Sequence, residues 1–247
     1  MRIVFITDLH GTVEYVDALA RSERGADLLL VGGDITNFGG EAGARAVMEP
    51  LLRSFAVVRA VPGNVDRPEV LEWLEAHGLS LHGRGERVGR VALSGCGGST
   101  LTPLLGPTEL PETAVASLLA RGARDVRDGR PWLLVTHVPP YESGADRVFL
   151  GKHVGSTALR DLLLASGPDL CLCGHIHEAR GIYRVGDSLV VNPGAFSARK
   201  YAVVEVDGPL LRPSLRELTV SRGVRLRADA WNVATKVTGY ARHRRRG

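Results

Sequence analysis

Short runs of apolar residues alternate along the chain with longer segments whose pattern is typical of helices. The short runs contain few polar residues, as expected of strands that are buried on both faces. Strands that alternate with helices in this way predict an α/β fold. The predicted strands are residues 3–6, 28–31, 55–61, 91–93, 132–135, 170–172, 189–191 and 201–206.

Five segments between these runs are predicted to be helices, and two of them begin with a recognisable start signal. Ser156 is suited to cap the last helix, and Pro68 suits the first turn of the third. The predicted helices are residues 13–22, 41–53, 68–77, 109–121 and 157–165.

The region after His177 is rich in short strands, with turn signals at residues 185–187 and 207–209. We expect antiparallel edge strands there that complete a second sheet. Because no long linker divides the chain, residues 1–220 are predicted to form one domain and residues 221–247 a C-terminal extension with a basic tail. A short helix in this extension would have one apolar face, which packs onto the body or, as the less favoured alternative, binds a partner. That face is formed by Trp231, Val233, Ala234, Val237 and Tyr240.

The composition is that of an ordinary globular protein, with 44% hydrophobic and 23% charged residues among 247. No stretch reaches the roughly 18 apolar residues of a membrane span, and the first residues lack the features of a secretory signal. Cys96, Cys171 and Cys173 do not suit a disulfide framework, so we expect a cytoplasmic protein. The net charge of +4 suits an anionic substrate without requiring nucleic acid.

Residues that can bind metals follow five of the predicted strands. In α/β sheets, side chains beyond the carboxyl ends of strands open onto one shared crevice, so these residues are predicted to form one site. Residues two apart in an extended segment also point to the same side, which would bring together each Asp-x-His or His-x-His pair. The candidates are Asp8 and His10, then Asp34, then Asn64, then His137, and finally His175 and His177.

The chemistry of this set favours a transition metal. Two carboxylates, one amide oxygen and four imidazoles suit manganese, iron, zinc or nickel better than calcium, which prefers cages made only of oxygen. Each residue alone could be a helix cap, a turn residue or a core histidine. Four histidines at strand ends are nevertheless hard to place in an apolar core without partners.

Five blocks of residues resemble the signature blocks of the calcineurin-like metallophosphoesterases. All five occur in the order that is typical of that superfamily, which makes the resemblance specific. It extends from Met1 to about Val206 and is greatest to the small prokaryotic phosphodiesterases, including the Icc-like branch. The blocks are AspLeuHis at 8–10, GlyAsp at 33–34, GlyAsnValAsp at 63–66, ThrHis at 136–137 and GlyHisIleHis at 174–177, followed by AsnProGly at 192–194.

The resemblance implies a four-layer α/β sandwich of two mixed β-sheets flanked by helices, and a hydrolase that acts on phosphate esters. It implies a dinuclear metal site in which Asp34 bridges the ions, with Asp34, Asn64 and His137 as catalytic residues. In-line attack on phosphorus by a metal-bridging hydroxide would follow. One ion would be bound by Asp8, His10 and His177, and the other by Asn64, His137 and His175.

From these implications we expect two divalent ions, with manganese first and iron, zinc or nickel as alternatives. The expected substrate is a small phosphate ester. Neither nucleic acid nor a membrane is an expected partner, and the sequence does not indicate an oligomeric state.

Val65 departs from the pattern of the family. This position usually holds a histidine that is thought to protonate the leaving group or contact the phosphate, and valine can do neither. Some relatives without this histidine still cleave phosphodiesters, so we expect a phosphodiester to be preferred over a phosphomonoester. General-acid help is worth roughly 10² to 10⁴ in rate, so poor leaving groups should react slowly.

Two alternatives to this enzyme stay open. A retromer subunit of the same fold also lacks the histidine and serves in protein interaction, so the chain could be a non-catalytic metal-binding scaffold, although its ligand set is complete. A nuclease is the second alternative, because residues 242–246 are basic, but a short terminal arginine cluster is more often solvated.

Other polar residues near the blocks have functional and ordinary interpretations side by side. Cys171 and Cys173 could join His175 and His177 in a zinc site, but buried thiols in a strand are the favoured interpretation. The glycine-rich residues 95–98 lack the lysine of a phosphate-binding loop and predict a turn. Substrate contact or plain packing is open for Tyr141, Lys152, His153, Arg180 and Arg199, and the surface is predicted for His77, His82 and His243.

Overall fold

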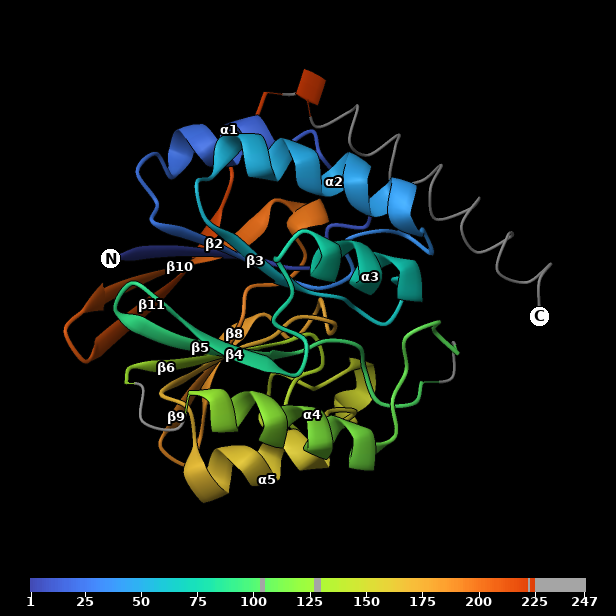
Figure 1. The fold of residues 1–247 in the computed structure, drawn as a ribbon, viewed down its shortest axis with the longest axis vertical. Coiled ribbons are helices and arrows are strands. Elements are labelled where there is room, and N and C mark those ends of the chain that lie inside the picture. Colours follow the sequence, from blue (N-terminus) through green and yellow to red (C-terminus); the bar gives the residue numbers. More distant parts are fainter. Residues whose placement is uncertain (103–104, 127–129, 222, 225–247) are drawn as a thin grey trace.

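In the computed structural model, two β-sheets pack face to face and helices cover both outer faces (Figure 1). The structure describes residues 1–102, 105–126, 130–221 and 223–224. Strand order is β11-β10-β1-β2-β3 in the first sheet and β4-β5-β6-β7-β9-β8 in the second. Both sheets are mixed, because parallel central strands are bordered by antiparallel ones. The predicted four-layer sandwich is confirmed.

The eight apolar runs all contain a strand, and the additional strands lie at sheet edges. β4 was not predicted because its residues are half-exposed and largely polar. The first sheet contains β1 (Arg2–Ile6), β2 (Leu28–Gly32), β3 (Val58–Val61), β10 (Lys200–Asp207) and β11 (Leu210–Glu217). The second contains β4 (Arg84–Val88), β5 (Val91–Cys96), β6 (Trp132–Thr136), β7 (Leu170–Leu172), β8 (Gly181–Val185) and β9 (Ser188–Asn192).

All five predicted helices are present, and they form the two outer layers of the sandwich (Figure 1). Pro68 lies in the first turn of its helix, and the Ser156 hydroxyl accepts a hydrogen bond from the Leu159 amide, as predicted. The layer over the first sheet contains α1 (Val16–Ser22), α2 (Glu41–Ser54) and α3 (Pro68–Ala76), and the layer over the second contains α4 (Glu112–Asp125) and α5 (Thr157–Ser166).

β1 shows why the central strands are apolar at every position. Val4 and Ile6 pack in the core under the first helical layer, whereas Ile3 and Phe5 pack in the core between the two sheets. Successive side chains of a strand point to opposite faces, so a strand with a helix layer on one side and a sheet on the other has no solvated face.

One expectation about the second half of the chain is wrong. β8 and β9 do complete the second sheet as an antiparallel pair. The hairpin formed by β10 and β11 instead belongs to the first sheet, where β10 pairs antiparallel with β1. This pairing buries both faces of β10, because Val203 contacts the core under the helices and Val204 the core between the sheets.

Two further predictions concern segment ends. The apolar run at 55–61 is only partly a strand, because Phe55 follows the last turn of α2 and β3 begins at Val58. The predicted extension at 221–247, with its apolar face, its basic tail and His243, lies outside the described residues except for positions 221, 223 and 224. In the described part of the chain, no helix combines the length and hydrophobicity needed to cross a membrane.

Candidate metal centre

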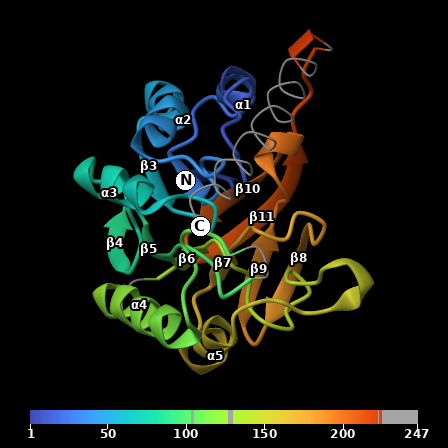
Figure 2. The same cartoon turned by 90° about the vertical axis from the view of Figure 1, so that its right-hand side faces the viewer.

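The seven predicted ligands all follow strands whose carboxyl ends lie on one side of the molecule, the side that faces the viewer in Figure 2. β1, β2 and β3 are parallel neighbours in the first sheet, and β6 and β7 are parallel neighbours in the second. The two ligand-bearing edges meet, because the His137 ring of the second sheet is hydrogen-bonded to the Gly32 carbonyl of the first.

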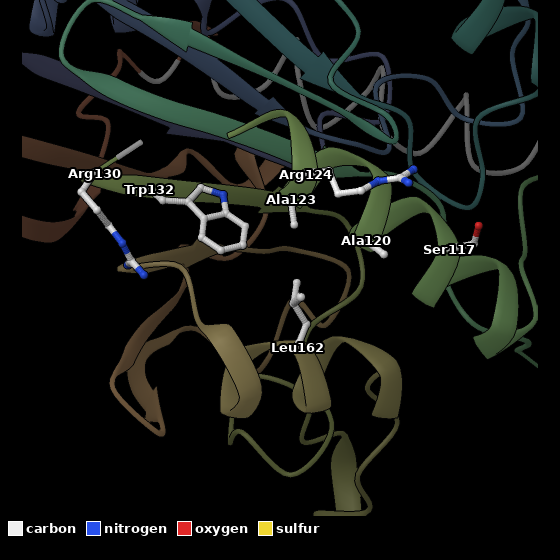
Figure 3. Close-up of a pocket in the computed structure, with 7 residues that line it drawn as sticks. All are labelled: Ser117, Ala120, Ala123, Arg124, Arg130, Trp132 and Leu162. Carbon is white, nitrogen blue, oxygen red and sulfur yellow. The ribbon is translucent and has the colours of Figure 1, made fainter. Parts of the chain in front are cut away.

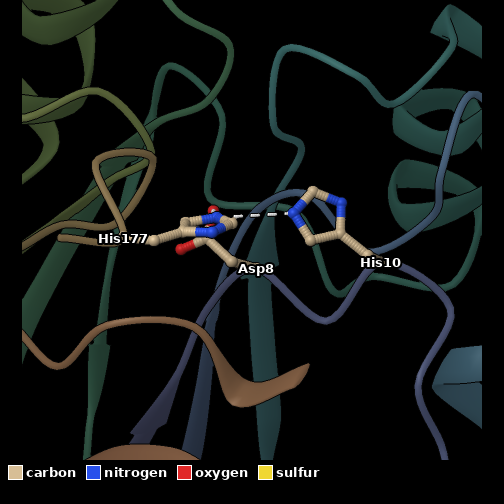
Figure 4. Close-up of side chains that lie close together, drawn as sticks. All are labelled: Asp8, His10 and His177. Atoms are coloured by element: carbon tan, nitrogen blue, oxygen red, sulfur yellow. Dashed lines mark hydrogen bonds and ion pairs between the residues drawn. The ribbon is translucent and has the colours of Figure 1, made fainter. Parts of the chain in front are cut away.

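Asp8, His10 and His177 form the first of two groups that could hold a metal ion (Figure 4). His177 Nε2 lies 3.2 Å from Asp8 Oδ1 and 3.4 Å from His10 Nε2. Asp8 is fully buried and also accepts a hydrogen bond from the backbone amide of His175. Three donor atoms from two sheets therefore converge on one point.

The second group contains Asp34, His137 and His175. His137 Nε2 lies 3.3 Å from Asp34 Oδ1 and 3.1 Å from Asn64 Oδ1. The rings of His137 and His175 have centroids 5.1 Å apart. The other oxygen of Asp34, Oδ2, lies 3.8 Å from His10 Nε2 in the first group, so this carboxylate stands between the two groups.

The hydrogen bonds of His137 test whether a cation fits here. A carbonyl can only accept, so the 2.8 Å contact with Gly32 O makes Nδ1 a donor and leaves Nε2 as the ring atom that could bind a metal ion. Nε2 faces the oxygens of Asp34 and Asn64. A cation held between these three atoms would take the place of the proton on Nε2, and the backbone contact to Nδ1 is a typical orienting bond for a histidine ligand.

The charges in the centre also favour a cation. Burial lowers the pKa of His137, but the neighbouring Asp34 carboxylate raises it more, to about 9. Burial raises the pKa of Asp34, yet the His137 and His10 rings hold it well below its ordinary value. The buried carboxylates therefore create a negative potential in which positive charge is stabilised.

Four of the seven candidate ligands have left-handed backbone conformations, which corrects the expected extended geometry. The φ angle is 57° at Asp8, 50° at His10, 47° at Asp34 and 67° at His175. Asp8 and His10 share a group, as expected, whereas His175 and His177 belong to different groups. Positive φ values are uncommon for residues other than glycine and cluster at functional sites, where surrounding structure holds them in place.

Two glycines are required by the close approach of the loops. A Cβ atom on Gly63 would lie 2.0 Å from Asp34 Oδ1, and one on Gly174 would lie 2.6 Å from Asp8 Oδ2. Any side chain there would displace a carboxylate of the centre.

Asp66 holds two ligand loops together, a role that sequence reasoning did not assign. Its buried carboxylate accepts hydrogen bonds from the backbone amides of Ile35, Thr36 and Gly63. It thereby fixes the loop after Asp34 against the loop that carries Asn64. Burial, followed by the charge of Asp34, raises the pKa of Asp66 to about 6. The signal for this residue was its place inside the GlyAsnValAsp block.

The sequence model of the calcineurin-like phosphoesterases matches residues 1–179. The chain belongs to this family. It is also similar to the uncharacterized protein MJ1162 of Methanocaldococcus jannaschii, with 36% identity over 211 residues that cover 83% of this chain and 92% of that protein.

Two solved structures have a fold similar to that of this chain. TT1561 of Thermus thermophilus has a TM-score of 0.66 at 20% identity, covering 86% of this chain and 97% of that one. The purple acid phosphatase PPD1 of yellow lupin has a TM-score of 0.59 at 11% identity, covering 88% of this chain and 51% of that one. At these identities the likeness concerns the fold.

The residues for which the sequence left substrate contact or zinc binding open make contacts within the protein. Arg180 donates to the carbonyl of Pro193, and Arg199 to that of Leu218. Cys171 and Cys173 are buried free thiols in a core cluster, and neither belongs to the two metal-binding groups found among the described residues. His153 is held by the buried Asp146 at 2.8 Å, with the Tyr141 ring nearby.

His82 is not on the surface, contrary to expectation. Only 8% of it is exposed, and its Nδ1 accepts a hydrogen bond from the Gly97 amide. Burial, assisted by the charge of Arg121, lowers the pKa of His82 to about 4. Residues 95 and 96 of the turn predicted at 95–98 belong to β5, and Gly97 after them packs on a neutral histidine. His77 is exposed, as predicted, and stacks on Trp73.

A cavity of about 680 Å³ lies between α4 and α5, lined among others by Trp132, Arg130 and Leu162 (Figure 3). Trp132 begins β6, whereas the candidate ligand His137 follows the opposite end of that strand. The cavity is therefore separate from the metal centre.

Proposed function

We propose that the chain hydrolyses phosphate esters with two divalent metal ions that share Asp34. The observation that carries this proposal is the position of the Asp34 carboxylate, whose oxygens face His10 on one side and His137 on the other. In this proposal the ligands are Asp8, His10 and His177 for one ion, Asn64, His137 and His175 for the other, and Asp34 for both.

Two divalent ions bound there would lower the pKa of water and neutralise charge on the phosphoryl oxygens. The chain's own residues set the geometry for in-line attack. The Val65 amide donates to Asp34 Oδ1 at 3.1 Å, and the Gly32 carbonyl fixes the ring of His137. With the amide oxygen of Asn64 beside that ring, we assign Asp34, Asn64 and His137 as the catalytic residues.

We propose manganese as the metal, with iron, zinc or nickel as alternatives. Four imidazoles accompany two carboxylates and one amide oxygen, a donor set between the all-oxygen cages of calcium and the thiolate sites of structural zinc. The free, buried cysteines fit the cytoplasmic location that we propose.

We propose a small phosphodiester as the preferred substrate. Val65 is 9% exposed, and its backbone amide contacts the carboxylate that we assign as the bridge. Its side chain cannot donate a proton to a leaving group. An acidic leaving group needs no such donor, and the preference for a diester rests on the resemblance of the sequence to the small prokaryotic phosphodiesterases of the family.

The test is a substrate panel on manganese-reconstituted protein. It includes bis-(p-nitrophenyl) phosphate, p-nitrophenyl phosphate, mononucleotides, cyclic nucleotides and dinucleoside polyphosphates. We expect hydrolysis of the aryl diester to exceed that of the aryl monoester, and chelation to abolish both. A faster monoester would overturn the diester preference and leave the phosphoesterase in place.

The same panel separates the enzyme from a non-catalytic metal-binding scaffold. A scaffold would bind metal and hydrolyse no member of the panel. The absence of a proton donor at Val65 is the observation that supports the scaffold as a second candidate function.

A further inference from the structure

The two most exposed large hydrophobic residues in the described part of the chain are neighbours. Phe149 is 84% exposed and Leu150 is 91% exposed. They form the tip of a loop at the short turn Phe149–Gly151, which projects at the right-hand edge of Figure 2 beside β8. We call these two residues the apolar tip.

The loop that carries the apolar tip is ordered by its own hydrogen bonds. The Val148 amide donates to Lys152 O at 3.0 Å, which closes the turn. Below it, the buried Asp146 carboxylate binds the His153 ring at 2.8 Å and accepts from the Glu142 amide. These hydrogen bonds hold the apolar tip at the end of an ordered hairpin.

Folding alone does not account for this display. Leu150 has a φ of 71°, a left-handed conformation that costs free energy for a leucine and none for a glycine. Burial of the Leu150 side chain within the protein does not offset this free-energy cost, because the side chain is almost fully exposed. A leucine at this position suits a surface outside the chain.

Basic residues flank the apolar tip. Arg147 and Lys152 are both exposed, one on each side of Phe149 and Leu150 in the sequence. Among the described acidic groups of the neighbourhood, Asp146 is buried against His153, and Glu142 pairs with Arg160. Glu178 lines a shallow depression beside Arg147 and Phe149 and is the acidic group that faces the loop.

The loop is also tied to the metal centre. It starts after His137, and the Asn192 side-chain amide donates both to Ala145 O in the loop and to Ile176 O between His175 and His177. One side chain therefore holds both the start of this loop and the turn between His175 and His177.

We propose that the apolar tip inserts into an anionic lipid surface, with Arg147 and Lys152 at the headgroups. Two side chains offer on the order of 300 Å² of apolar area, well below the roughly 800 Å² per partner of a stable protein interface. A lipid surface needs no complementary shape and attracts the flanking cations. The sequence analysis expected no membrane partner, and the contact proposed here is with the surface of a membrane.

Vesicle sedimentation tests the proposal with the full chain and does not depend on catalysis. Vesicles contain equal parts of phosphatidylglycerol and phosphatidylcholine, or phosphatidylcholine alone. The unmodified protein should sediment with the anionic vesicles. Phe149→Ser with Leu150→Ser should weaken binding about 10²-fold, and Arg147→Gln with Lys152→Gln about 10-fold at low salt.

Leu210→Ser is the matched control, because Leu210 is 54% exposed at the start of β11. The turn between β10 and β11 lies beside the amino end of β1, whereas the loop of the apolar tip follows the carboxyl end of β6. The control variant should bind as the unmodified protein does. If the serine variant of the tip binds vesicles as well as the unmodified protein does, the proposal is overturned and binding belongs to another surface. If the free protein self-associates and the serine variant does not, the tip binds a second copy of the chain, which also overturns the proposal. Absence of vesicle binding would also overturn it.

A second variant keeps the test valid if the double serine variant does not fold. Phe149→Trp should shift its added emission to shorter wavelength on mixing with anionic vesicles, because the indole leaves water. An unchanged emission in a sample that contains excess vesicles would contradict insertion.

Discussion

At the residue scale, the dinuclear proposal depends most on Asp34, because its two oxygens face different ligand groups. We expect Asp34→Ala to abolish turnover and to lower bound metal from about two equivalents towards one. His137→Ala should abolish turnover as well. Elemental analysis and hydrolysis of an aryl diester measure the two effects, and circular dichroism reports the fold. More than a few per cent activity in metal-replete Asp34→Ala would reject the bridging role.

Val65 predicts how the rate depends on the leaving group. Without a proton donor, rates should fall steeply as the pKa of the leaving group rises. Val65→His should flatten this dependence and accelerate poor leaving groups by up to roughly 10²-fold. The decisive quantity is the slope of log rate against leaving-group pKa in the unmodified protein. If that slope is shallow while chemistry limits the rate, a donor already exists, and His153 and Tyr141 are the first residues to replace.

Asp66 is expected to act as a positioning residue. An asparagine in its place would turn an NH₂ group towards backbone amides that now donate to a carboxylate. We predict that Asp66→Asn weakens metal binding about 10- to 100-fold, and that excess metal partly restores activity. Metal titration measures this, with Asp161→Asn on the exposed face of α5 as the control. Equal metal affinity in Asp66→Asn would contradict the role.

At the scale of elements, the start of α5 is joined to α4 by a shared cap. The Ser156 hydroxyl accepts from the Leu159 amide and donates to Glu112, whose carboxylate also accepts from the Thr157 and Ala158 amides. We predict that Ser156→Ala lowers the free energy of unfolding by about 1 kcal/mol. Urea denaturation measures the loss. Ser54→Ala, at the last turn of α2, removes an exposed hydroxyl that caps no helix start and should have a smaller effect.

At the scale of the whole molecule, the buried His82 makes stability depend on pH. Its pKa is about 4 in the folded chain and about 6.5 in the unfolded chain, so between these values only the unfolded chain binds the proton. Stability from this group is therefore complete above pH 6.5 and falls as the pH drops towards 4. Between pH 7 and pH 5 the loss should be about 2 kcal/mol.

Replacing the histidine should remove this loss. We expect His82→Gln to reduce the fall in unfolding free energy between pH 7 and pH 5 relative to the unmodified protein, as measured by denaturation at each pH. All other titrating groups are common to both proteins and cancel in the comparison. His77→Gln, which alters an exposed histidine, is the control, and a fall in His82→Gln as large as in the control would refute the assignment.

Much of this molecule could be predicted from its sequence, because local patterns determine local structure. The continuous apolar runs identified every central strand, since a strand between a helix layer and a second sheet must be apolar at each position. The candidate ligands were predictable because they follow those runs. The recognised blocks then indicated how the ligands divide into two groups.

Other features depend on contacts between distant segments, which no local pattern encodes. Pairing of β10 with β1 decides the sheet to which the last hairpin belongs, and burial by neighbouring loops decides that His82 is neutral and that Asp66 joins two ligand loops. The left-handed backbone at Asp8, His10, Asp34 and His175 is likewise held by tertiary contacts. The sequence by itself determined which groups are candidates for the chemistry, and the tertiary structure decided where each one points, because orientation depends on atoms far away along the chain.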